Sequence, residues 1–180
     1  MIILRDLSPE WLIVSGFCTA MKFFVEAPIF VFREWHRHRH FSYNEASGRY
    51  MELAGRFYIP KPDRKLIQVG KPGAYEFIEG TPEQYDLVTE QLELAYDAGW
   101  NAYQTILEAG VAKEVARMAL NLGLFSQMHT TCNARSLMHF LSLRTNEPTA
   151  TFPSKPQWEI EECARMLEAE FAKLFPITYD

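Results

Sequence analysis

The first third of the chain changes its polarity pattern over short distances. Residues 19–25, TAMKFFV, form an aromatic and roughly alternating run that predicts a β-strand. Pro28 then suits the first turn of a helix through IFVFREWHR, because proline at that position removes no helical hydrogen bond. The next segment, HFSYNEASG, is rich in turn-forming residues and predicts a loop, after which RYMEL predicts a return to extended backbone.

A long amphipathic segment covers residues 81–110. Thr81 and Gln84 have the spacing of a capping box, Pro82 fits the first helical position, and Gly110 is typical of a helix end. Apolar residues recur at helical spacing along it and predict a face that packs in the core or against another subunit. These residues are Tyr85, Val88, Leu92, Tyr96, Tyr103 and Leu107.

The second half of the chain alternates helical and extended patterns. It predicts a helix over VAKEVARMAL, a strand over FSQMHTT, a helix over NARSLMHFLSLR capped by Asn133, and a last helix opened by Ser154 and Gln157 and ended by Pro176. Helices dominate, and the few strands can pair only antiparallel or over long connections. The pattern therefore predicts the α+β class.

Length and composition suit one soluble domain over residues 1–180. The chain is 48% hydrophobic and 14% aromatic, which is enough to bury a core, and it has no repeat or linker. No run approaches the ~18 apolar residues of a membrane helix. The first 17 residues lack the basic start and cleavage site of a signal peptide, so we expect a cytoplasmic protein.

The charge and the cysteines narrow the possible partners. The net charge of −5 argues against a general attraction to nucleic acid or to a membrane surface, so we expect neither partner. Cys18, Cys132 and Cys163 are odd in number and show no CxxC spacing, which argues against a disulfide framework or a thiolate zinc site. We expect them to be small buried hydrophobic residues.

The segment REWHRHRHFSYNEASGRY, residues 33–50, is strongly basic in this acidic chain. A metal site of His36, His38 and His40 is disfavoured by the arginines between the histidines, because their charges oppose a divalent cation. A solvated basic helix end and a single-stranded nucleic-acid surface, with Trp35, Phe41 and Tyr43 for stacking, are further alternatives.

A pocket for a phosphorylated ligand explains more of this segment than the alternatives do. Ser42, Asn44, Glu45 and Ser47 add hydroxyl, amide and carboxylate groups next to Gly48. Further arginines stand in otherwise apolar helical segments and can donate to phosphate oxygens. They are Arg117, Arg135 and Arg144. The chain has no GxGxxG and no Walker A sequence, so the arginines have to hold any phosphate groups.

The string RHRHFSYNEASGRY, from Arg37 to Tyr50, resembles the signature of the flavin-dependent thymidylate synthases. The core of that signature is Arg-His-Arg, seven residues and then Ser, which Arg37, His38, Arg39 and Ser47 match. The similarity continues through APIFVFREW, FYIPKP, GVAKEVARMAL, NARSLMHFLSLR and QWEIEECA in the family's order, over residues 21–176. It implies an antiparallel sheet flanked by long helices and a homotetramer whose active sites are shared between subunits.

The resemblance also implies a reaction and its residues. dUMP would be methylated to dTMP, with methylenetetrahydrofolate as one-carbon donor, FAD as cofactor and NADPH as reductant. Residues at FAD-binding positions of the family are Arg37, His38, Arg39, Glu45, Asn133, Ala134, Arg135 and His139. Residues at dUMP-binding positions are Glu34, Arg37, Glu45, Ser47, Gly48, Arg49, Arg117 and Arg144. Arg144 would be catalytic, as a cation that stabilises charge on the pyrimidine ring.

The chain also departs from the family pattern. Residues 1–20 are atypical, since VSGFCTA stands where a segment like His-x-Thr-Pro-Phe-Glu-His is usual. Glu34 replaces a usual glutamine, which either puts an anionic group near the nucleotide or pairs with an arginine instead. Asn121 stands where proline often follows the leucine. The alternative function is a catalytically impaired relic that still binds nucleotide or flavin.

Overall fold

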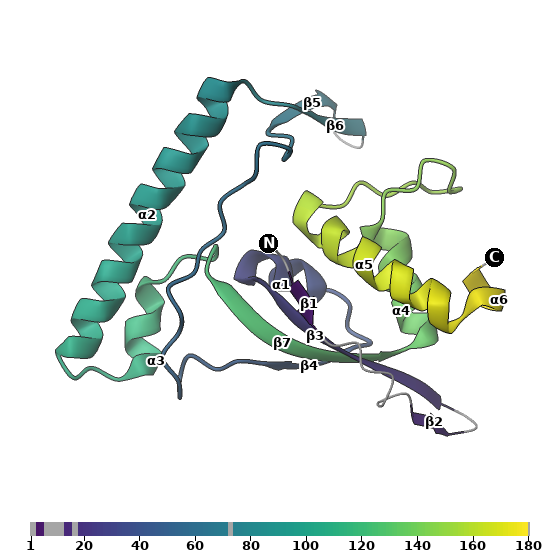
Figure 1. The fold of residues 1–180 in the computed structure, drawn as a ribbon, viewed down its shortest axis with the longest axis horizontal. Helices are drawn as coiled ribbons and strands as arrows, with labels where there is room; N and C mark the ends of the chain where they lie inside the picture. The colour runs from purple at the N-terminus through teal and green to yellow at the C-terminus, as the bar shows by residue number, and fades with distance from the viewer. Residues whose placement is uncertain (1–2, 6–12, 16–17, 72–73, 180) are drawn as a thin grey trace. The chain divides into compact units, whose positions relative to one another are not determined.

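The computed structural model describes residues 3–5, 13–15, 18–71 and 74–179 (Figure 1). They form two compact units, the first from Met1–Ala46 and Ser126–Asp180 and the second from Ser47–Phe125. One domain over the whole chain remains a prediction. The expectations about the start of the chain fall largely on residues 1–2, 6–12 and 16–17, which lie outside the described residues.

The first unit is built on a five-stranded sheet. Its strands are β1 (Ile3–Arg5), β2 (Ile13–Ser15), β3 (Cys18–Pro28), β4 (Ser42–Glu45) and β7 (Phe125–Asn133). The order is β1-β3-β7-β4, with β2 also on β3. The β1–β3, β2–β3 and β4–β7 pairs are antiparallel, which confirms the predicted α+β class with an antiparallel sheet.

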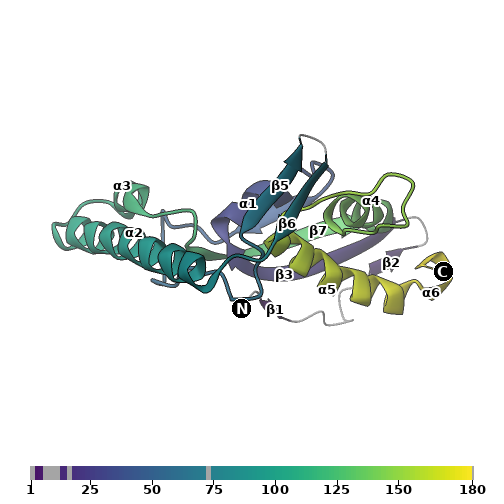
Figure 2. The same cartoon turned by 90° about the horizontal axis from the view of Figure 1, so that it is seen from above.

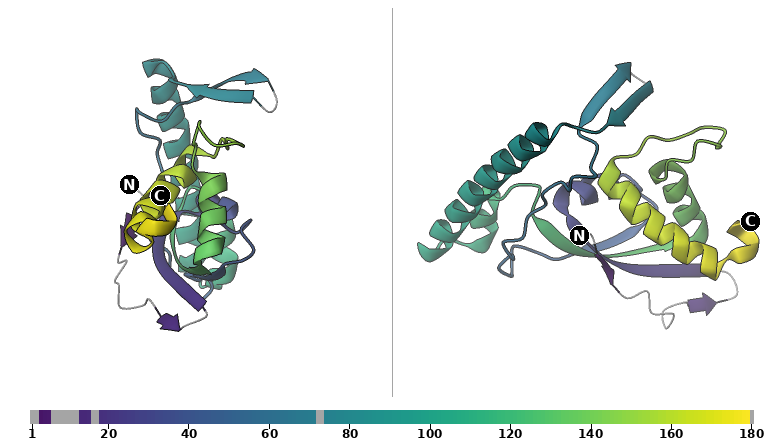
Figure 3. Two further views of the ribbon diagram at one scale, coloured as in Figure 1. Left: turned by 90° about the vertical axis from the view of Figure 1, so that its right-hand side faces the viewer. Right: turned by 45° about the horizontal axis from the view of Figure 1, so that its top comes forward.

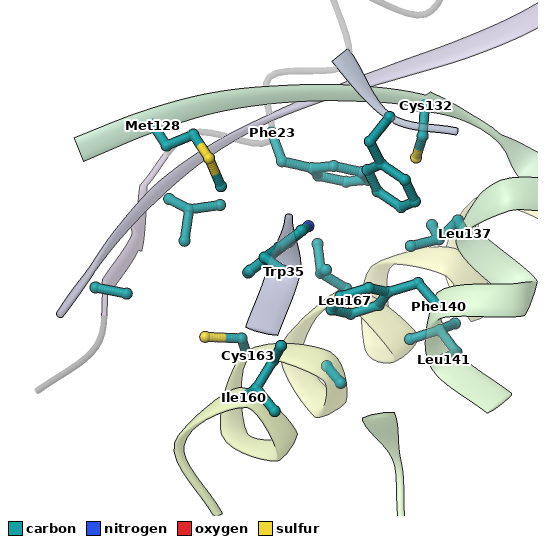
Figure 4. Packing of buried hydrophobic residues seen from close by; sticks show 14 of the residues in the cluster. Phe23, Trp35, Met128, Cys132, Leu137, Phe140, Leu141, Ile160, Cys163 and Leu167 are labelled. Atoms are coloured by element: carbon teal, nitrogen blue, oxygen red, sulfur yellow. The ribbon is translucent and has the colours of Figure 1, made fainter. Parts of the chain in front are cut away.

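Helices cover one face of this sheet (Figure 1). They are α1 (Ile29–Trp35), α4 (Ala134–Arg144) and α5 (Trp158–Leu174), and the short α6 (Pro176–Tyr179) follows α5. Alternate residues of β3, Met21, Phe23 and Val25, are buried, as the two-residue period of a strand requires. They belong to one apolar cluster with Trp35 and Leu167. Figure 4 shows Phe23, Trp35 and Leu167 in this cluster.

Of the two helix starts predicted from capping residues in this unit, the structure confirms one and corrects the other. Asn133 caps α4 as predicted, because its side-chain oxygen accepts from the Ser136 N–H at 2.8 Å. The predicted start of α5 was wrong in detail, since the helix begins after Gln157 without a side-chain cap. Ser154 instead donates its hydroxyl to the Thr145 carbonyl at 2.7 Å.

The segment predicted as a loop after α1 contains strand β4. Its residues pair with β7 from Ser42 opposite Thr131 to Glu45 opposite Met128. The local composition predicted turns, but a neighbouring strand edge supplies backbone hydrogen bonds that composition does not reveal. RYMEL is not a strand either, because residues 48–50 form a turn in which Ser47 O accepts from the Tyr50 N–H at 3.1 Å.

The second unit contains a hairpin and a long helix. Strands β5 (Ile67–Lys71) and β6 (Ala74–Ile78) pair antiparallel next to the start of α2 (Pro82–Glu108) (Figure 3). The predicted helix over residues 111–120 is shorter and consists of α3 (Lys113–Ala116) and the 3-10 turn η2 (Arg117–Ala119). Figure 2 shows α3 beside α2.

The predicted features of α2 are confirmed. Thr81 and Gln84 form the capping box, and Gly110 follows the helix with a φ of 78°. Tyr96 and Tyr103 are buried, and the other four residues of the predicted apolar face are half-buried. The apolar stripe is therefore the covered face of the helix.

Phe140 is expected to be a major contributor to the stability of the first unit. Its ring is fully buried and lies 4.8 Å from the ring of Trp35. We expect Phe140→Ala to lower the free energy of unfolding by about 3–5 kcal/mol because it leaves a cavity. Met138→Ala, at a site that is 39% exposed on the same helix, is the matched control and should cost less than about 1 kcal/mol. Urea unfolding measures both, and equal losses would contradict the expectation.

Candidate functional site

The first unit holds a pocket of about 1070 Å³ between the end of α1, the loop that follows it and α4. Its volume is at the upper end of the roughly 300–1,000 Å³ usual for ligand sites. The lining residues are Glu34, Arg37, His38, Arg39, His40, Phe41, Asn133, Arg135, Ser136, His139, Leu143 and Arg144. Four of them are arginines and only one is a carboxylate, so the pocket is electropositive and suits an anionic ligand.

Arg144, the last residue of α4, is fixed by three hydrogen bonds. Its Nε donates to Nε2 of His38 at 2.9 Å, and its Nη1 donates to Oε2 of Glu34 at 2.8 Å. Its Nη2 donates to the Glu34 carbonyl at 3.1 Å. Since a guanidinium has five N–H donors, two remain for a ligand. The side chain is only 14% exposed, so this cation is both held and largely shielded from water.

His38 is neutral in this arrangement. Because Nε2 accepts from Arg144, the ring proton of the neutral imidazole must be on Nδ1. Burial lowers the pKa of His38 to about 4, and the charges of Arg144, His139 and Arg37 add to the effect. The imidazole is 6% exposed and packs on the Phe140 ring at 4.7 Å.

Glu34 connects two arginines of the pocket. Its carboxylate lies 2.8 Å from Nη1 of Arg144 and 3.8 Å from Nη1 of Arg37. Of the two roles considered for Glu34, the structure shows the pairing with arginine. The Arg144 contact is the stronger one, because the Arg37 side chain is 73% exposed and solvent screens its charge.

Other cations extend into the pocket from two directions. Arg37 and Arg39 follow α1 and are exposed, and Arg135 is exposed in the first turn of α4. The first N–H groups of α4 add a partial positive charge beside Arg135. Exposed guanidinium groups beside a helix N-terminus fit phosphate oxygens.

Four of the predicted nucleotide-binding residues, Ser47, Gly48, Arg49 and Arg117, lie in the second unit. A Cβ on Gly48 would lie 2.9 Å from Cδ1 of Leu53 and 3.4 Å from Cδ of Arg117, so Arg117 lies close to the turn at residues 47–50. Arg49 donates its Nε to Glu114 at 2.9 Å. Within this unit the structure brings Gly48 and Arg117 together, and Arg49 joins them through α3.

The pocket lining overlaps only in part with the predicted site residues. Glu45, at the end of β4, and Ala134, in the first turn of α4, do not line the pocket. Sequence analysis missed several lining residues, namely His40, Phe41, Ser136 and Leu143. Their closeness in sequence to Arg39, Asn133 and Arg144 was a usable signal.

The structure also bears on the competing interpretations of the basic segment. Trp35 is fully buried and Phe41 is 8% exposed, so neither can be a stacking platform for nucleic-acid bases, and that interpretation was wrong.

Cys132 and Cys163 are buried as expected, and burial raises the pKa of each thiol to about 12. The side chain of Cys18 lies outside the description.

Among the residues that the structure describes, no three His, Cys, Asp or Glu side chains gather as metal ligands would. In the same part of the chain, no helix is both long enough and apolar enough to cross a membrane.

The fold and the pocket define a mixed α+β protein with an arginine-rich site for an anionic ligand. The chain belongs to the family described as thymidylate synthase complementing protein, whose sequence model matches residues 18–177. This assignment agrees with the resemblance carried by the segment from Arg37 to Tyr50.

Named relatives support the assignment. The chain is 57% identical to the flavin-dependent thymidylate synthase of Streptomyces coelicolor and 53% identical to that of Tropheryma whipplei, over 89% and 88% of its length. It spans 65% and 66% of those two proteins. A solved structure of the UMP/dUMP methylase PolB from Streptomyces cacaoi, bound with 5-Br UMP, is similar with a TM-score of 0.86 and 45% identity. That match covers 89% of this chain and 70% of the methylase.

Acid is expected to destabilise the protein through His38. The pKa of His38 is about 6.5 in the unfolded chain and about 4 in the folded protein. Between these two pH values the unfolded chain therefore binds more protons than the folded protein. The free energy of unfolding should therefore fall as the pH is lowered from 6.5 to 4, by a total of the order of 3 kcal/mol. Above pH 6.5 this contribution should be constant.

Urea unfolding between pH 4 and pH 8 measures the effect. His38→Gln is the control, because its amide can still accept from Arg144 but does not titrate. The difference between wild type and variant isolates His38 from the carboxylates that titrate in the same range. Identical pH profiles would contradict the assignment of the effect to His38.

Proposed function

We propose that the protein methylates dUMP to dTMP. Methylenetetrahydrofolate would supply the one-carbon unit, which replaces the hydrogen on C5 of the pyrimidine. That hydrogen leaves as a proton, and a hydride reduces the added methylene group to methyl. FAD, reduced by NADPH, supplies this hydride when it is bound. The observation that carries the proposal is the fixed Arg144 cation in the pocket of a family member.

The donor set of the pocket fits the phosphate groups of FAD. Arg37, Arg39 and Arg135 present exposed guanidinium groups, and the α4 N-terminus adds backbone donors. His139 and Asn133 line the same pocket. We assign these residues, with His38, Glu45 and Ala134, to FAD binding. GxGxxG and Walker A sequences are not needed for this mode of binding, because side-chain guanidinium groups hold the phosphates.

We assign eight residues of the chain to nucleotide binding. Ser47, Gly48, Arg49 and Arg117 supply a hydroxyl, a close backbone approach and two cations. Arg37, Glu34, Glu45 and Arg144 complete the proposed set. A homotetramer with shared active sites is part of the proposal, supported by Leu87 and Leu94 of α2, which are 56% and 59% exposed. We infer a cytoplasmic enzyme with dUMP, folate and NADPH as its partners.

Arg144 would act electrostatically. Methyl transfer to C5 requires electron density at that carbon, and negative charge develops on the uracil carbonyl oxygen as the ring is activated. Two N–H groups of Arg144 remain available to stabilise that charge. A guanidinium remains protonated at any working pH, so Arg144 does not remove the C5 proton.

Arg144→Lys is expected to lower kcat by about 100-fold or more. The ammonium group of lysine has only three N–H donors, so it cannot both make three hydrogen bonds to the protein and donate two to the base. Tritium release from [5-³H]dUMP, measured anaerobically in the full-length protein with FAD, NADPH and methylenetetrahydrofolate, gives the rate. Arg33→Lys, at an exposed position of α1 outside the pocket lining, is the control and should be active.

Two outcomes would contradict the proposal. Full activity of Arg144→Lys would remove Arg144 from the chemistry. No tritium release from the assembled wild-type protein would reject methylation, and flavin absorbance or dUMP binding in that protein would then support the impaired relic.

The related UMP/dUMP methylase makes the sugar a second point to test. We expect kcat/KM for dUMP to exceed that for UMP by about tenfold or more, because the 2′-hydroxyl of UMP needs a hydrogen-bond partner in a site built for deoxyribose. Methylation of each nucleotide under the same conditions measures the ratio. An equal or higher kcat/KM for UMP would assign the chain a ribonucleotide substrate.

A further inference from the structure

We propose that Tyr43, a β4 residue outside the pocket lining, is a positioning residue for Arg144 and acts through the His38 backbone. The proposal rests on the function proposed above only in giving Arg144 its chemical role. The contacts that carry it lie within the first unit.

The single proton of the Tyr43 hydroxyl is shared between two backbone carbonyls. Its oxygen lies 2.8 Å from the carbonyl oxygen of Trp35 and 2.7 Å from that of His38. Trp35 is the last residue of α1, where helical carbonyls lose their intrahelical partners. The Trp35 carbonyl also accepts from the His38 N–H at 2.9 Å. The hydroxyl therefore closes the turn that carries His38.

The tyrosine ring is itself held by rigid neighbours. Tyr43 is half-buried in β4 and pairs with Thr130 of β7. Its ring stacks on Phe41 at an interplanar angle of 8° and meets the edge of the His36 ring at 4.7 Å. Burial raises the pKa of Tyr43, so its hydroxyl remains a proton donor throughout the working range. A strand residue with a packed ring is a firm anchor for a loop.

Both partners of Arg144 belong to the segment that Tyr43 secures. Glu34 and His38 are on either side of the tied carbonyl of Trp35. The His38 imidazole accepts from Arg144 Nε, and Glu34 accepts from both terminal nitrogens. A small shift of this segment would therefore move the guanidinium. Reactions that depend on positioned groups are sensitive to displacements of about 1 Å.

The first test does not depend on turnover. Tyr43→Phe removes only the hydroxyl and keeps the stacked ring, so we expect folded protein. NMR of isotope-labelled arginine side chains should show the Arg144 Nε–H exchanging with water about three- to tenfold faster than in wild type, since one typical hydrogen bond is lost from its support. His38→Leu removes the acceptor itself and sets the upper limit of the rate.

Tyr85→Phe is the matched control. It deletes another tyrosine hydroxyl that bonds to a backbone carbonyl, that of Arg64 in the second unit. Its Arg144 Nε–H exchange should equal that of wild type. An unchanged rate in Tyr43→Phe, or an equal increase in Tyr85→Phe, would overturn the proposal.

A double-mutant cycle separates positioning from a general structural role. We expect Tyr43→Phe to lower kcat/KM for dUMP about three- to tenfold in the wild-type background and to have no further effect in Arg144→Lys. Equal losses in both backgrounds would show that Tyr43 does not act through Arg144. If the wild-type protein releases no tritium, the proposed function fails, and the exchange measurement still decides whether Tyr43 positions Arg144.

Discussion

A guanidinium that is largely shielded from water must keep its N–H groups hydrogen-bonded, and in this protein that requirement organises one wall of the pocket. Arg144 donates to His38 and twice to Glu34. The bond to His38 requires a neutral imidazole with its proton on Nδ1, while Glu34 supplies the compensating charge. The cation is therefore fixed before any ligand arrives, which is the condition under which electrostatic stabilisation is most effective.

The apolar core places these groups. Phe140 of α4 packs against Trp35 of α1 and against His38, with ring centroids 4.8 and 4.7 Å apart. Because α1 and α4 cover the same face of the sheet, the end of one helix and the loop after the other meet at one pocket. The burial that stabilises this unit also lowers the pKa of His38, so packing and protonation state are linked.

The basic segment of the sequence is divided between the two compact units. Residues up to Ala46 belong to the first unit, and Ser47, Gly48 and Arg49 belong to the second. The division separates the exposed arginines of the pocket from the turn that Arg117 adjoins. In the proposed function Arg39 and Arg135 bind the flavin, the turn at residues 47–50 binds the nucleotide, and Arg37 contributes to both. The contiguous motif thus contributes residues to the binding of two ligands.

Local features were predictable because the residues that decide them are neighbours in sequence. Pro28, Asn133 and the capping box at Thr81 mark helix starts by contacts within about four residues, and the apolar stripe of α2 reports its covered face. The strand β4 was not predictable, because it depends on pairing with β7. The role of Tyr43 was not predictable either, because it depends on hydrogen bonding to the Trp35 and His38 carbonyls. The basic motif by itself favoured a site for a phosphorylated, anionic ligand over the alternatives. Only the tertiary structure decided that Arg144 is held by Glu34 and His38, since 110 and 106 residues separate it from them and no local pattern records such a contact.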